Sequence, residues 1–78
     1  MNTVIVHLRF GDELKVSIPR EGEYRTIVRA ALDAVRDVSH WELPVSGTLT
    51  QSPLGRHELM LDSGHESKKF EYKEGAFR

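Results

Sequence analysis

Three histidines stand one or two residues before a glutamate, a pairing that metal binding or acid–base chemistry would use. The pairs are His40 with Glu42, His57 with Glu58, and His65 with Glu66. Metal sites of this kind use fixed spacings such as H-x-x-x-H or H-E-x-x-H, and the chain has neither spacing and no cysteine. We therefore expect no metal and no cofactor, and a small metal-dependent enzyme remains the third hypothesis for function.

The chain contains no sequence motif for nucleophilic catalysis or for phosphate transfer. The serines lie outside any G-x-S-x-G pattern. The six glycines are scattered, one at each expected turn, and are never grouped as a phosphate-binding loop. We predict that the protein is not an enzyme.

Arginines offer a different chemistry, because a guanidinium group grips phosphates and carboxylates with paired hydrogen bonds. Arg25, Arg29 and Arg36 fall on one edge of a predicted helix. The same arginines can also be a solvated surface paired with Asp33 at helical spacing. A nucleic-acid-associated protein that uses this edge is therefore the alternative hypothesis.

Two apolar residues favour a protein partner instead. Trp41 is either a lid that closes one end of the sheet or an exposed anchor for a partner. Met60 is predicted, with Ile5, to be an apolar island on the outer face of the sheet. The predicted partner-binding residues are Arg25, Arg29, Arg36, Trp41 and Met60.

One helix, over residues 23–38, is expected to organise the fold. Its apolar residues form one continuous arc at 100° per residue, with the charged residues on the other side. Gly22 is the predicted N-cap, and the helix is expected to end within a residue or two of Asp37. The members of the arc are Tyr24, Ile27, Val28, Ala31, Leu32, Ala34, Val35 and Val38.

Alternating apolar residues predict two strands before this helix, over residues 3–10 and 14–18. A three-residue loop, 11–13, keeps the apolar residues of both strands on one face. This loop pairs Phe10 with Leu14, Leu8 with Val16, and Val6 with Ile18.

After the helix we expect an irregular crossover over residues 40–45 and then a three-stranded meander. Its strands are predicted at 47–51, 57–61 and 67–73. A two-residue turn, Ser63–Gly64, would pair Leu59 with Lys68. Because residues 47–51 carry no charge, we expect them to be paired, inside the sheet or with a second copy.

The predicted fold class is α+β, as one domain over residues 1–78. A single antiparallel or mixed sheet of four to five strands carries one amphipathic helix on one face, in the order ββα followed by βββ. The opening hairpin and helix resemble the β-grasp arrangement of ubiquitin-like proteins. The chain ends Gly75-Ala76-Phe77-Arg78 rather than Gly-Gly, so this resemblance implies no conjugation chemistry.

Net charge and composition limit the partners that the protein is expected to bind and the compartment in which it is expected to act. The 78 residues have a formal net charge of −1, which gives no general attraction to nucleic acid or to an anionic membrane. Without cysteine or a long apolar segment, the chain is expected to be cytoplasmic and to have no membrane partner.

By elimination, the leading hypothesis is a non-enzymatic module that binds another protein or protein complex, as an inhibitor, adaptor or accessory subunit. Small size, missing cysteine and missing catalytic motifs are similar to those of small phage-encoded inhibitors of host or defence machinery. A homodimer through an edge strand is also expected to be accessible to this fold.

Overall fold

A computed structural model of the chain describes residues 3–8, 11–38, 40–41 and 44–78. It contains one helix, α1 (Tyr24–Asp37), and one six-stranded sheet. The strands are β1 (Val4–His7), β2 (Glu13–Ser17), β3 (Ser46–Gln51), β4 (His57–Asp62), β5 (Ser67–Lys73) and β6 (Ala76–Phe77).

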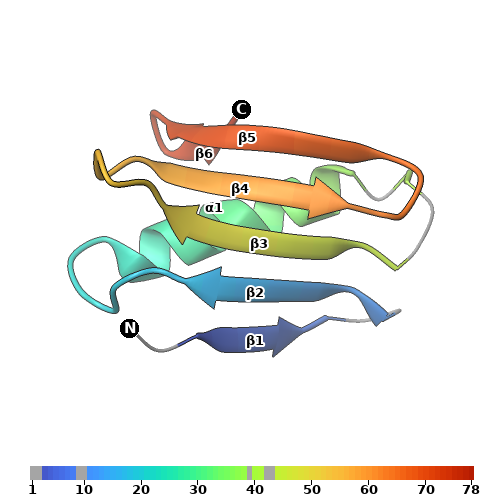
Figure 1. Cartoon of the computed structure of the whole chain (residues 1–78), viewed down its shortest axis with the longest axis horizontal. Coiled ribbons are helices and arrows are strands. Elements are labelled where there is room, and N and C mark those ends of the chain that lie inside the picture. Colours follow the sequence, from blue (N-terminus) through green and yellow to red (C-terminus); the bar gives the residue numbers. More distant parts are fainter. Residues whose placement is uncertain (1–2, 9–10, 39, 42–43) are drawn as a thin grey trace.

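The strands lie in the sheet in the same order as in the sequence (Figure 1). All neighbouring strands are antiparallel except β2 and β3, which are parallel. The chain crosses between these two strands through α1, which packs on one face of the sheet and leaves the other face uncovered (Figure 1). The α+β class and the order ββαβββ are confirmed, with one strand more than expected.

The helix packs on the sheet through the predicted apolar arc. Its buried residues are centred slightly to one side of the middle of that arc. Val28 and Leu32 are only partly buried, whereas Ala30, outside the predicted arc, is buried. The predicted N-cap is wrong by one residue, because Gly22 adopts a positive φ of 62° and Glu23 occupies the cap position. The C-terminal end at Asp37 is confirmed.

The core lies between this helix and the inner face of the central strands. Buried apolar side chains come from every strand from β2 to β4, from β6, and from the residues that flank β2 and β3. They are Leu14, Val16, Ile18, Val45, Leu49, Leu59, Leu61 and Phe77. The partly buried Phe70 and Tyr72 pack against this cluster from β5, on the face predicted for them.

The predicted register of the first hairpin is wrong, although the faces are right. Val6 pairs with Leu14 rather than Ile18, an even shift that keeps each side chain on its expected face. The hairpin turns earlier than predicted, because Leu8 N donates to Asp12 O at 2.8 Å and so pairs these two residues. On the other side of β2, the Asp12 carboxylate accepts a hydrogen bond from Val45 N at 2.8 Å, and Glu13 N donates to Val45 O at 3.0 Å. These bonds to the chain before β3 make Glu13 the first residue of β2. Phe10, the third predicted partner, lies outside the described residues.

The turn between β4 and β5 also differs from the prediction. Leu59 pairs with Phe70 rather than Lys68, because the turn contains four residues, 63–66, instead of two. Asp62 Oδ1 accepts from Gly64 N at 2.7 Å, and Ser63 Oγ accepts from Glu66 N at 3.2 Å. Such side-chain bonds to nearby backbone stabilise a wider turn.

Both ends of the meander become part of the sheet. The strand β3, predicted to be paired, lies inside the sheet between β2 and β4. The last residues turn back at Glu74 and Gly75, both with positive φ, so that β6 pairs with β5. This return buries Phe77 on the face of the sheet that α1 covers, so the C-terminal segment completes the core.

Candidate binding surface

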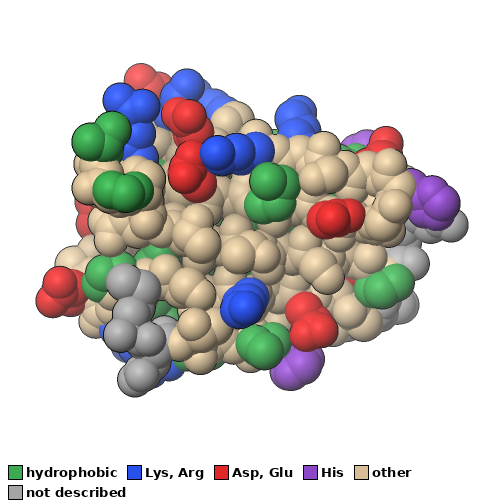
Figure 2. All heavy atoms as spheres, viewed as in Figure 1, with side chains coloured by type: hydrophobic (Ala, Val, Ile, Leu, Met, Phe, Trp, Pro, Cys, Tyr) green, Lys and Arg blue, Asp and Glu red, His purple; other side chains and the backbone are tan. Residues whose placement is uncertain are grey.

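The helix covers one face of the sheet and leaves the other, the open face, uncovered. Figure 2 views the molecule from this side, and shows charged side chains of both signs scattered among neutral ones, with hydrophobic side chains as separate spots. Met60, predicted to lie here, has 42% of its surface exposed, and Ile5 has 50%. Strand alternation places both residues opposite to the buried ones, as the sequence pattern indicates.

Ile5 and Met60 belong to one row of cross-strand neighbours. Ile5 is opposite Lys15, Lys15 is opposite Thr48, and Thr48 is opposite Met60. With strands about 4.8 Å apart, the two apolar ends of this row lie roughly 14 Å from each other. Between them are a lysine, whose stem is four methylenes long, and a threonine methyl group. We call Ile5, Lys15, Thr48 and Met60 the open-face strip.

The rows on both sides of the open-face strip are polar. On one side they contain hydroxyls and acidic groups, and the hydroxyls of Thr3 and Ser17 are 3.1 Å apart. Beyond Met60, Lys69 Nζ lies 3.1 Å from a Glu58 carboxylate oxygen, and the Glu58 side chain is only 27% exposed. The flanking rows are Thr3–Ser17–Thr50–Glu58–Glu71 and His7–Glu13–Ser46–Asp62–Ser67.

The predicted arginines lie on the other side of the molecule. Arg25, Arg29 and Arg36 are all exposed, on the side of α1 that faces away from its buried residues. At 1.5 Å per residue they form a line roughly 16 Å long. Arg36 is 3.6 Å from Asp33, and no ion pair joins Arg25 or Arg29 to any other residue that the structure describes. We call these three residues the arginine stripe.

Trp41 is separate from both surfaces. Its side chain is partly buried and packs against the core just beyond the end of α1, as the lid interpretation expects. His40 contacts it edge to face, with ring centroids 6.5 Å apart. The structure therefore does not bring the five predicted residues together, because Met60, Trp41 and the arginine stripe occupy three different places.

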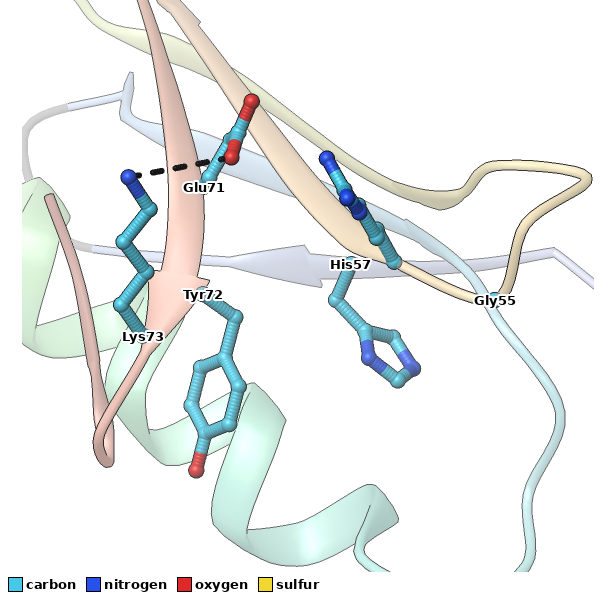
Figure 3. A pocket seen from close by; sticks show the side chains of 6 residues that line it. Gly55, His57, Glu71, Tyr72 and Lys73 are labelled. Atoms are coloured by element: carbon cyan, nitrogen blue, oxygen red, sulfur yellow. Dashed lines mark ion pairs between the residues drawn. The ribbon is translucent and has the colours of Figure 1, made fainter.

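A hollow that sequence reasoning missed lies at the end of the sheet where β4 begins and β5 ends. It has a volume of about 500 Å³ and is open to solvent. Figure 3 shows the His57 and Tyr72 side chains on its wall pointing to the helix side, while Glu71 points the other way and pairs with Lys73 at 4.0 Å. The hollow is lined by Gly55, Arg56, His57, Glu71, Tyr72 and Lys73.

His57 also lines a second, smaller hollow beside the start of α1. Its ring meets Tyr72 edge to face at 6.3 Å, so its neighbours are aromatic as well as charged. Among the described residues no carboxylate or hydroxyl orients the imidazole by a hydrogen bond, which is the arrangement that a general base usually has. The hollows are assembled from strand ends far apart in the sequence, so no local motif could have indicated them.

The predicted histidine–glutamate pairs form no metal-binding cluster among the described residues. Within the described residues, no three histidine, aspartate or glutamate side chains gather as metal ligands would. Glu42, predicted as a neighbour of His40, lies outside the described residues, as does Leu43. In the described part of the chain no helix has the length and apolar character needed to cross a membrane.

Compared with models of protein families, with curated proteins and with solved structures, the chain matches none. The resemblance to β-grasp proteins is accordingly limited to the opening hairpin and the helix that follows it. In this chain the parallel contact joins β2 and β3, the two strands that flank the helix.

Proposed function

We propose that this protein is a non-enzymatic module that binds another protein and acts by occupying a surface on a larger assembly, as an inhibitor, adaptor or accessory subunit. The observation that carries the proposal is the open-face strip. The helix leaves one face of the six-stranded sheet uncovered, and the strip places two exposed apolar side chains, Ile5 and Met60, on that face.

The arrangement of the strip resembles the anatomy of a transient protein interface. Such interfaces have a partly apolar centre, enriched in methionine, inside a polar rim that keeps the free protein in solution. Here Met60 and Ile5 supply the apolar contacts, and the flanking hydroxyl and carboxylate rows supply the rim. A methionine side chain also adapts to the shape of its partner at low cost, because it is unbranched and polarizable.

The experiment is affinity capture from a native lysate, with the wild-type protein, Met60→Glu and Arg29→Glu as baits. Both substitutions act at exposed sites, where small effects on stability are expected. Met60→Glu lowers the net charge by one unit and Arg29→Glu by two, so the control carries the larger change in charge. We expect one specific protein to be retained by the wild type and by Arg29→Glu, and to be lost with Met60→Glu. Identical retention by all three baits would contradict the proposal.

Nucleic-acid binding through the arginine stripe is the second candidate function. It is favoured by one observation, namely that three exposed guanidinium groups lie on one line and two of them have no ion pair with a described residue. Binding through three phosphates would weaken with salt, with a log–log slope of roughly −2 to −3. A salt titration on duplex and single-stranded oligonucleotides measures this slope. Arg25→Glu combined with Arg29→Glu should abolish any binding that uses the stripe.

A further inference from the structure

The two edges of the sheet are finished in opposite ways. At the β5 edge the chain returns as β6, and Glu71 exchanges two hydrogen bonds of 3.0 Å with Arg78. Where β6 stops, the exposed Lys68 and Lys69 guard the rest of β5. Natural sheets use such lysines and covering segments to prevent pairing with other chains. Among the described residues the β1 edge has neither device, since no strand pairs with its outer side and Val4–His7 contains no Lys, Arg, Asp or Glu.

The backbone groups on the outer side of β1 can be assigned from the hydrogen bonds on its inner side. Leu8 N donates to Asp12 O at 2.8 Å, so Leu8 faces β2. Bonded and non-bonded pairs alternate along antiparallel strands, so Val4 and Val6 also face β2, and Thr3, Ile5 and His7 face outward. Glu13, opposite His7, bonds to Val45 on its other side, which agrees with this assignment.

We propose that a second copy of this chain pairs antiparallel with the outer edge of β1, about a two-fold axis at Ile5. In this register the N–H and C=O groups of Ile5 bond to those of the other Ile5. Thr3 and His7 of each copy bond to His7 and Thr3 of the other, so every outward backbone group of the described strand finds a partner. An interface of this kind is closed, as two-fold symmetry requires.

The side chains of β1 fit this pairing on both faces of the sheet. On the open face, the half-exposed Ile5 meets its own copy, and no charges of the described strand oppose each other. On the helix side, Val4 and Val6 are only partly buried, because α1 packs chiefly against β3, β4 and β6. Pairing sets Val4 beside the Val6 of the second copy and so covers an apolar surface that the helix leaves uncovered.

The β1 edge is a better pairing site for a second copy than the β5 edge of the same sheet. Pairing β1 with β5 would have to displace β6 or place the strand against Lys68 and Lys69, and head-to-tail pairing would extend into an open filament. Pairing β1 with β1 requires only the outer edge of β1, and stands whether or not the open face binds another protein. A four-residue strand makes a small interface, so we expect a dissociation constant on the order of 100 µM.

The first experiment uses the wild-type chain at increasing concentration. Sedimentation should show a reversible equilibrium between a species of 8.9 kDa and one twice as heavy. Amide exchange measured in the same series should slow at Ile5 and His7 as the concentration rises. The amide of Val6, which already faces β2, is the internal control and should not change. A chain that stays monomeric up to about 1 mM would overturn the proposal.

Three variants then locate the contact. Ile5→Pro removes an outward N–H and no bond to β2, a position where an edge strand tolerates proline. Ile5→Lys places on β1 a charged side chain like those of Lys68 and Lys69 at the β5 edge, which disfavours pairing with another strand. Both should weaken the dimer at least about tenfold while the helix signal in circular dichroism is retained. Met60→Lys, with the same added charge on the same face but on β4, should dimerise like the wild type.

Two further outcomes would contradict the proposal. A dimer that is equally strong in Ile5→Pro or Ile5→Lys would not use the edge of β1. A dimer broken equally by Met60→Lys and Ile5→Lys would be formed by the open face rather than by the edge. If Ile5→Pro loses its helix signal, the amide-exchange series on the wild type still decides, because it requires no substitution.

Discussion

The two faces of this sheet are made by alternate residues of the same strands, yet they obey different constraints. On β4, Leu59 and Leu61 are fully buried beneath the helix, whereas their neighbour Met60 is 42% exposed on the open face. The side chains of the inner face are close-packed, and each methyl group contacts several others. The open face must only remain soluble and avoid wrong pairing, so its residues can change with little effect on folding. Stability is therefore concentrated on one face, and the other is available for recognition.

The harshest test of the inner face is a charge placed in it. Ala31 is fully buried where α1 meets the sheet, so Ala31→Asp would put an unpaired carboxylate in an apolar environment. This costs several kcal/mol against a total stability of about 5 kcal/mol, and we expect the domain to be unfolded at 25 °C. Circular dichroism and thermal melting measure this directly. Thr26→Asp, on the exposed side of the same helix, is the control and should melt like the wild type.

Neighbouring residues of β4 allow the two faces to be compared at matched chemistry. Leu59→Ala should lower the free energy of unfolding by about 3 kcal/mol, because it removes buried methyl groups and leaves a cavity. Met60→Ala should cost less than about 1 kcal/mol, since the side chain is largely exposed. Denaturant unfolding gives both values. Similar losses for the two variants would mean that the open face is packed against something in solution.

Gly47 tests how tightly the inner face is filled beside β3. A Cβ atom at this position would lie 2.9 Å from Leu14 Cδ1 and 3.0 Å from Leu61 Cδ2, both in fully buried side chains. We expect Gly47→Ala to cost about 1–3 kcal/mol by overpacking. Thr48→Ala, one residue away on the open face, should stay within about 0.5 kcal/mol of the wild type in the same measurement. If Gly47→Ala left the free energy of unfolding unchanged, the core would have more space beside Gly47 than the structure shows.

The smallest effect is expected from the ion pair on the open face. Glu58→Gln removes the contact of 3.1 Å with Lys69 Nζ and should cost only about 0.5 kcal/mol at low salt. The difference should shrink further at about 1 M salt, where the Debye length is about 3 Å. Denaturant unfolding at the two salt concentrations measures it. A loss above about 2 kcal/mol would show that this pair behaves like a buried one.

Periodicity was sufficient to predict most of the secondary structure. The helix end at Asp37 and both ends of β5 agree with the sequence pattern, and so do the faces on which the described residues of the five predicted strands lie. These features depend on neighbours a few residues away, whose spacing the sequence states directly. The exposure of Met60 and of the arginines on α1 follows from the same spacing.

Register could not be predicted in this way, since it depends on contacts between distant residues. The first hairpin turns earlier than the alternation indicates, with Leu8 paired to Asp12, and the later turn is widened by bonds to the side chains of Asp62 and Ser63. The sixth strand was missed because Ala76 and Phe77 are too short a segment to show a period. The hollow at His57 combines the beginning of β4 with the end of β5, so it exists only once the β4–β5 pairing is known.

The sequential order of the strands has a consequence for how the chain folds. Every strand pair except one is joined by a short turn, and such pairs close rapidly with little loss of chain entropy. Only β2 and β3 must meet across residues 18–45, with the helix formed between them. We therefore expect the barrier to lie at that crossover. Substitutions in β2, α1 or β3 should slow folding. Those in β6, whose contacts with α1 require the helix to have packed on the sheet, should mainly speed unfolding.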